Sequence, residues 1–154
     1  MKKIISIISL ILWMIVIFLF SSADANKSTG TSDKVISTMI EIKDKITDSN
    51  TSLEDKNYII DNTSFIIRKI AHVTEYLILG FLMFNVLMQY NICNIYCAIG
   101  LCILYSCTDE FHQLFIDGRS GSIRDVLIDS IGIIIGTLLY KLIFIKKDKI
   151  AKNN

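Results

Sequence analysis

The stretch Arg68–Tyr76, which reads Arg-Lys-Ile-Ala-His-Val-Thr-Glu-Tyr, opens one of the chain's apolar runs with a group of ionisable side chains. On a helix, Arg68, His72 and Glu75 are spaced i, i+4 and i+7, so they share one face. Ionisable groups at the edge of an apolar segment are costly to place near a membrane. They therefore indicate a functional site, with each other as partners.

A second polar group, Asp109–Gln113 (Asp-Glu-Phe-His-Gln), ends the next apolar run. Asp109, His112 and Gln113 share a helical face in the same way. Two consecutive spans run antiparallel, so the start of one and the end of the next lie at the same membrane depth. We therefore expect His72 and Glu75 to meet the Asp109–Gln113 group.

Composition places the chain in a membrane. It has 154 residues, 52% of them apolar, no Pro and a net charge of +1, with a mean hydropathy of +0.51. These values are too apolar for an ordinary soluble domain and predict one small integral membrane domain, residues 1–154. With a net charge near zero, no strongly basic surface indicates a nucleic-acid partner, and none is predicted. All four Cys lie in or beside one apolar run without metal-ligand spacing and are predicted to pack, so they predict no metal site. No cofactor is predicted, and the sequence leaves the metal content open.

Four spans are predicted, at about 4–20, 70–90, 93–109 and 125–145. The first follows a basic flank and has two interpretations: a retained helix, or a signal peptide cleaved near Ala23-Asp24-Ala25. In the last, Gly132 and Gly136 form a face suited to close helix approach.

The polar residues between the first two spans, about 21–64, are predicted to lie outside the cell. Within them an apolar row at helical spacing predicts an amphipathic helix with Ser32 as its N-cap. Ser52-Leu-Glu-Asp predicts the cap of a second, short helix toward Ile60. The row consists of Val35, Met39, Ile42 and Ile46. The predicted fold is thus all-α: an integral membrane four-helix bundle with an extracytoplasmic amphipathic helical insert between helices one and two.

Both ends of the chain carry Lys, whereas the connection Asn91–Asn94 is uncharged. The positive-inside rule then places both termini in the cytoplasm of a cell-membrane protein. This topology brings the polar residues of spans two, three and four to the outer side, and predicts an outward-facing site.

The residues quoted above, in order, resemble the VanZ-like family of bacterial multi-pass membrane proteins. Further matching pieces are Phe20-Ser-Ser, Gly118-Arg119 and Asp125. The chain departs from the family pattern at Asp117, where a Pro is usual, and at Asp129, where an Asn is usual. The resemblance implies a multi-pass membrane protein, and its founding member is associated with low-level resistance to the glycopeptide teicoplanin.

The site residues fall into two sets. A candidate functional cluster could serve as acid and base groups or as metal ligands, and a second set could bind an anionic ligand. The alternative is that all of them only clamp helix ends together. The first set is His72, Glu75, Asp109, Glu110 and His112; the second is Gln113, Arg119, Arg124 and Asp125.

Two functions follow from these residues and the resemblance. The first is an accessory membrane protein that binds an envelope ligand, either a lipid-linked wall precursor or a lipophilic glycopeptide, and so contributes to resistance. The second is a small membrane enzyme that acts on a lipid or lipid-linked headgroup. Membrane lipids are partners in both, and the sequence leaves the oligomeric state open.

Overall fold

The computed structural model describes residues 1–23, 25–119 and 121–145. Within them every regular element is helical, which confirms the all-α class. Asp24 of the predicted cleavage site and the basic tail used in the topology argument lie outside the described residues. The elements are α1 (Lys2–Ser21), α2 (Ala25–Thr47), α3 (Leu53–Gln89), α4 (Ile95–Gln113), α5 (Ile123–Tyr140) and a π-helical turn (Lys141–Ile145).

The longest element, α3, is one continuous helix of 37 residues, about 55 Å at 1.5 Å per residue. The prediction of a short helix toward Ile60 followed by a separate span from residue 70 was therefore wrong. The predicted cap is confirmed, because Ser52 Oγ accepts the backbone N–H of Asp55 at 3.1 Å. Neither Gly nor Pro occurs in α3 before Gly80, so its backbone has no reason to break between the two predicted pieces.

The connection after α3 is a tight turn. Asn91 has a φ of +62°, in the left-handed region that Asn tolerates better than most residues, and backbone hydrogen bonds close the end of α3 there. Asn94 then caps α4, since its Oδ1 accepts the N–H of Tyr96 at 2.9 Å. The chain thus folds back, and α4 carries the Asp109–Gln113 group on its last turns.

Helices α3 and α5 touch backbone to backbone. A Cβ added at Gly80 of α3 would lie 2.5 Å from the carbonyl oxygen of Ile133 in α5. In return, a Cβ at Gly132 or Gly136 of α5 would collide with carbonyl groups of α3. The Gly132–Gly136 face therefore does what its spacing predicts, because only Gly permits so close an approach.

Two sets of polar contacts mark the two ends of the packed helices. At one end, here the Ser6 end, Asn85 of α3 donates to Ser6 Oγ of α1 at 3.2 Å and accepts the Tyr140 hydroxyl of α5 at 3.0 Å. At the other, here the His112 end, His112 Nε2 of α4 lies 3.2 Å from Ser22 Oγ after α1. The start of α1 and the end of α5 thus lie together.

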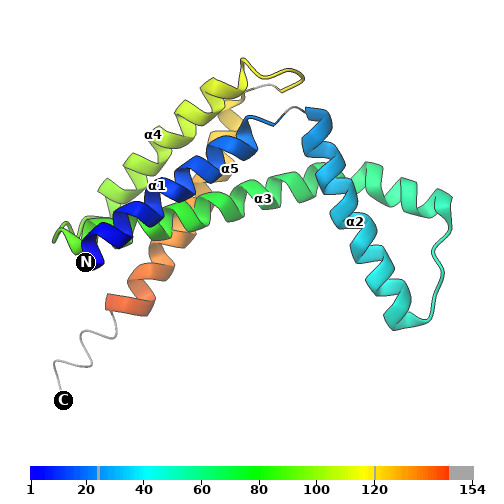
Figure 1. Ribbon diagram of the computed structural model, residues 1–154, viewed down its shortest axis with the longest axis horizontal. Coiled ribbons are helices and arrows are strands. Elements are labelled where there is room, and N and C mark those ends of the chain that lie inside the picture. Colours follow the sequence, from blue (N-terminus) through cyan, green and yellow to red (C-terminus); the bar gives the residue numbers. More distant parts are fainter. Residues whose placement is uncertain (24, 120, 146–154) are drawn as a thin grey trace.

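Helix α2 crosses the first half of α3 and forms a second arm, away from α1, α4 and α5 (Figure 1). It begins at Ala25, so Ser32 lies inside the helix, buried, and is not its N-cap. Ile36 and Ile40 are buried, and Ser64 of α3 donates to Asp33 of α2. The predicted apolar row lies exposed on the same helix, at Val35, Met39, Ile42 and Ile46.

Asp44 holds the connection between α2 and α3. Its carboxylate accepts the Thr51 hydroxyl at 2.7 Å and the Thr51 N–H at 3.0 Å. Both bonds lower the pKa of Asp44, to about 2, and the bond from the Thr51 hydroxyl has the larger effect. The carboxylate therefore remains charged, and accepts both bonds, at any pH well above that value.

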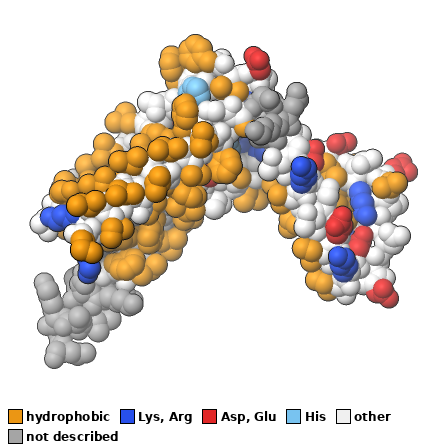
Figure 2. Space-filling view, in the orientation of Figure 1, with side chains coloured by type: hydrophobic (Ala, Val, Ile, Leu, Met, Phe, Trp, Pro, Cys, Tyr) orange, Lys and Arg blue, Asp and Glu red, His pale blue; other side chains and the backbone are white. Residues whose placement is uncertain are grey.

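Among the described residues, three helices are long and apolar enough to cross a membrane: Lys2–Ser21, Leu53–Gln89 and Ile123–Phe144. The predicted fourth span, α4, is not among them, and its last turns carry Asp109, Glu110 and His112. Hydrophobic side chains cover most of the visible surface of the arm that contains α1, α4 and α5. Charged side chains gather on the second arm, which contains α2 (Figure 2). A surface this apolar is typical of helices that face lipid.

We expect Gly136→Ala to destabilise the fold by about 1–3 kcal/mol, because the added methyl group meets the α3 backbone. Gly100→Ala in α4 is the matched control, since nothing lies within 4 Å of its added Cβ. This control should gain up to about 1 kcal/mol from helix propensity. Reversible unfolding in detergent measures both, and equal stabilities for the two variants would contradict the close α3–α5 contact.

Candidate functional site

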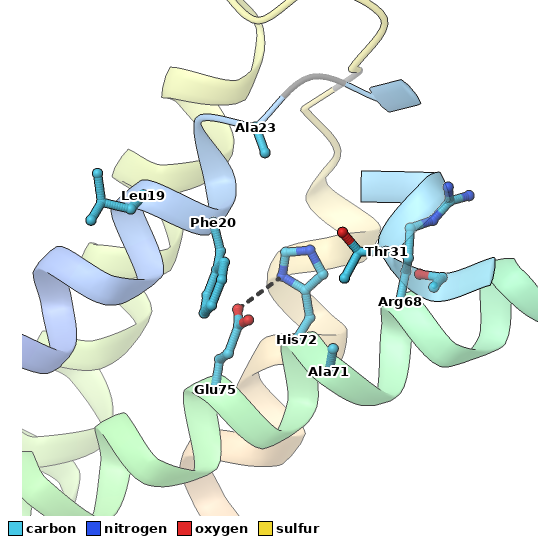
Figure 3. A pocket seen from close by; sticks show the side chains of 9 residues that line it. Leu19, Phe20, Ala23, Thr31, Arg68, Ala71, His72 and Glu75 are labelled. Carbon is cyan, nitrogen blue, oxygen red and sulfur yellow. Dashed lines mark ion pairs between the residues drawn. The ribbon is translucent and has the colours of Figure 1, made fainter. Parts of the chain in front are cut away.

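A pocket of about 420 Å³ opens where the end of α1, the first turns of α2 and the middle of α3 meet. One part of its wall is apolar and the other polar, as Figure 3 shows. The insert between the first two predicted spans therefore forms part of the site. The lining residues are Leu19, Phe20, Ala23, Thr31, Ser32, Arg68, Ala71, His72 and Glu75.

The polar wall is the predicted face of α3. Arg68, His72 and Glu75 follow one another along it, with His72 in the middle (Figure 3). His72 Nδ1 lies 3.9 Å from Glu75 Oε2, which is an ion-pair distance but too long for a hydrogen bond. This buried nitrogen has no hydrogen-bond partner among the described residues. The face therefore keeps unused hydrogen-bonding capacity.

Two neighbouring helices hold this face in place. From α1, the Trp13 indole donates to the backbone oxygen of Glu75 at 2.9 Å. From α2, Thr29 accepts a hydrogen bond from the Arg68 guanidinium through its hydroxyl. The first contact holds the Glu75 end of the polar wall, and the second holds its Arg68 end.

The second predicted group ends α4 and is more deeply buried. Asp109, Glu110 and Gln113 are 3–5% exposed, and the Gln113 amide donates to Asp109 Oδ2 at 3.2 Å and to Glu110 Oε1 at 3.3 Å. Glu110 Oε2 also accepts the N–H of Ser122 at 2.9 Å, just before α5. This group therefore ties α4 to the start of α5.

A further layer of buried polar side chains lies one turn earlier on α4, around Ser106. Ser106 donates to Asp129 Oδ2 at 2.7 Å, and Tyr76 of α3 lies beside Ser106 and Asp109. The Tyr76 hydroxyl, Asp109 Oδ1 and Asp129 Oδ1 are buried without a hydrogen-bond partner within the described residues. Unpaired buried polar atoms are costly, so this layer is not optimised for stability alone.

The two predicted groups lie near each other but are not directly bonded. The charge of Asp109 acts on both His72 and Glu75. The hydrogen bonds of the described residues nevertheless include none from His72 or Glu75 to the Asp109–Gln113 group. His112 points elsewhere: its ring stacks on Phe18 of α1 at a centroid distance of 4.6 Å.

Arg119 lies close enough to both groups for the charges of Asp109, Glu110 and Glu75 to act on it. Its guanidinium donates to the backbone oxygen of Phe20 at 3.3 Å, directly behind the apolar wall of the pocket. Burial lowers the pKa of Arg119, and the carboxylates of Asp109, Glu110 and Glu75 oppose that shift. An arginine remains charged in proteins, so Arg119 adds a positive charge near the pocket.

The ion-pair partner of Asp125 is a residue outside both predicted sets. The Asp125 carboxylate pairs with Lys69 of α3, not with Arg119. The two side chains are 23% and 24% exposed, so the pair is largely shielded from water. Arg124 lies on an exposed position at the start of α5 and is not brought into the pocket lining.

Sequence reasoning missed three contributors. Lys69 stands next to Arg68 in the opening stretch, but adjacent helical residues point to different faces, which hid its link to α5. Trp13 lies in the middle of an apolar run, where its indole N–H needs a partner, and that need was the available signal. The α2 hydroxyl groups carried no recognisable motif.

The arrangement offers hydrogen-bond donors for a ligand, and its His72–Glu75 pair can also exchange a proton. Arg68 offers a fork of N–H donors, and His72 stands beside it with a carboxylate behind. Among the residues that the structure describes, no three His, Cys, Asp or Glu side chains come together to hold a metal ion.

The model of one protein family, described as VanZ/LLP1, matches residues 6–144. The match runs from the first turn of helix α1 through the insert and the site to the turn after α5. No curated protein and no solved structure matches the chain.

A double-mutant cycle tests the Lys69–Asp125 pair. We expect Lys69→Met and Asp125→Asn to couple by about 0.5–3 kcal/mol in the free energy of unfolding, because the two residues are in direct contact. Arg119→Gln with Asp125→Asn is the control and should be additive within about 0.5 kcal/mol. The reverse ranking would identify Arg119 as the partner of Asp125.

Proposed function

The chain belongs to the VanZ/LLP1 family of membrane proteins, and on that basis we propose that its pocket binds a ligand of the cell envelope. By binding this ligand, the protein serves an accessory role in resistance to lipophilic, teicoplanin-type glycopeptides. The observation that carries the proposal is a pocket with one polar and one apolar wall. The Arg68–His72–Glu75 face of α3 forms the polar wall, and the end of α1 forms the apolar one.

We further propose that α4 is the fourth span of a bundle formed with α1, α3 and α5. It has 19 residues, a length of about 28 Å, close to the hydrocarbon thickness of about 30 Å. Its Tyr105 hydroxyl donates to the Met14 backbone oxygen of α1 at 2.7 Å, which supports a path alongside that span. The contacts of the Ser6 end, where α1 begins and α5 finishes, agree with termini on one side.

In this topology the His112 end faces outward. The first part of α3 and all of α2 then project beyond the bilayer, because α3 is far longer than the hydrocarbon is thick. The pocket lies at the level where lipid headgroups begin. A ligand of the outer leaflet can reach it without crossing the membrane.

The second candidate is a small membrane enzyme that acts on a lipid-linked headgroup. The His72–Glu75 pair in the pocket wall favours it, because such a pair can move a proton. The hydroxyl groups of Thr31 and Ser32 line the same pocket and are the candidate nucleophiles of this alternative. Binding remains the proposal, because a polar wall beside an apolar one is sufficient to hold a ligand without any reaction.

Site-directed labelling tests the topology. In a background in which the other native Cys are replaced, Asn50→Cys should react with an impermeant thiol reagent on intact cells. Native Cys93, in the α3–α4 connection, should react only after lysis and is the matched control. Labelling of Cys93 on intact cells, with residue 50 protected, would turn the pocket toward the cytoplasm.

Drug susceptibility tests the function. Expression of the chain in a glycopeptide-susceptible bacterium should raise the inhibitory concentration of teicoplanin severalfold. His72→Ala should abolish this gain at an equal membrane level of protein, whereas Arg124→Gln, an exposed cation outside the pocket, should keep it. A lipid composition that changes with the wild type and reverts with His72→Ala would favour the enzyme. Resistance equal in all three proteins would refute the role of the pocket.

A further inference from the structure

The chemistry of the pocket defines a ligand class. Its outer polar group is the Arg68 guanidinium, whose planar fork suits phosphate and carboxylate oxygens. His72 follows one helical turn later on the same face. Arg119 is outside the lining and lies near the carboxylates of Asp109, Glu110 and Glu75. The hydrogen-bond donors of Arg68 and His72 therefore favour an anionic group over a cationic one.

Glu75 limits where that group can sit. It lies seven positions after Arg68, which is about 10 Å along the helix. The carboxylate lies behind His72, so it repels an anion at the inner end of the pocket and orients the imidazole. A single anionic group is therefore favoured beside Arg68 and His72, at the outer end of the face.

The apolar wall indicates what the anionic group is attached to. Leu19 and Phe20 line the pocket, yet they are 62% and 59% exposed. They belong to α1, whose outer surface is apolar throughout the helix. The pocket wall is thus continuous with a surface that faces lipid, and it offers a hydrocarbon chain a way out to the side.

We infer, building on the proposed function, that the pocket binds the phosphate headgroup of a membrane amphiphile. Arg68 and His72 hold the phosphate oxygens by charge-assisted hydrogen bonds. The hydrocarbon chain leaves along Leu19 and Phe20 into the bilayer. Helix α2 closes the side opposite α1 with the hydroxyl side chains of Thr31 and Ser32.

The chain carries its own reporter for this binding. Trp13 is its single tryptophan, and the indole N–H of Trp13 donates a hydrogen bond to the backbone oxygen of Glu75. The purified full-length protein in an uncharged maltoside detergent can be titrated with dodecyl phosphate while Trp13 fluorescence is followed. We expect a saturable change that inorganic phosphate and dodecyltrimethylammonium each reproduce at least tenfold more weakly.

Three variants assign the binding to the pocket. Arg68→Gln should weaken dodecyl phosphate binding at least tenfold, whereas Arg124→Gln should stay within twofold of the wild type. If Arg68→Gln does not fold, the exposed Leu19→Asn variant replaces it. That variant should weaken dodecyl phosphate severalfold and leave butyl phosphate unchanged, because only the longer chain reaches along α1.

Specific outcomes overturn the inference. Equal affinity for inorganic phosphate would mean a free phosphate site, and equal affinity for dodecyltrimethylammonium would mean an unselective apolar surface. Unchanged binding in both Arg68→Gln and Leu19→Asn would place the ligand elsewhere.

The binding and resistance assays can also disagree. If His72→Ala abolishes resistance but dodecyl phosphate does not bind, the ligand class fails and the proposed function stands. If dodecyl phosphate binds but the chain has no effect on resistance, the ligand class stands and the proposed function fails.

Discussion

The contact between the backbones of α3 and α5 determines where everything else in this structure lies. Gly80, Gly132 and Gly136 let the two helices approach until carbonyl groups of one face the Cα atoms of the other. That approach fixes both the crossing point and the register. It places the first turns of α5 against the middle of α3, so that Asp125 meets Lys69 and the buried Asp129 meets Ser106 of α4.

Much of the local structure followed from the sequence because its causes are local. The helical face of Arg68, His72 and Glu75 is a matter of spacing, and the Ser52 cap is a matter of residue type. The glycine face of α5 was likewise predicted from its period. The continuity of α3 was missed for a related reason: the first half of α3 is more polar than the second, but no Gly or Pro interrupts its backbone before Gly80.

The contacts at the site that the sequence did not reveal have a different origin. Whether Asp125 pairs with Arg119 or with Lys69 depends on how α3 rotates against α5, and spacing within one helix carries no information about that rotation. The contribution of α2 was hidden for the same reason. Its Ile36 and Ile40 pack away from water, and this contact, rather than any motif, brings Thr31 and Ser32 to the pocket.

The unpaired polar atoms and the position of the pocket together bear on whether a polar group is a clamp or a site. A clamp would satisfy its members with one another, as Glu110, Gln113 and the Ser122 N–H largely do. His72 is held close to Glu75 but leaves a buried nitrogen unpaired. Such a group costs stability, and a pocket lies directly beside it. The end of α4 has both features, because Glu110 and Gln113 tie it to the start of α5 while Asp109 Oδ1 is left unpaired. The α3 face differs in that it lines a pocket, which is why the proposed ligand site is placed there.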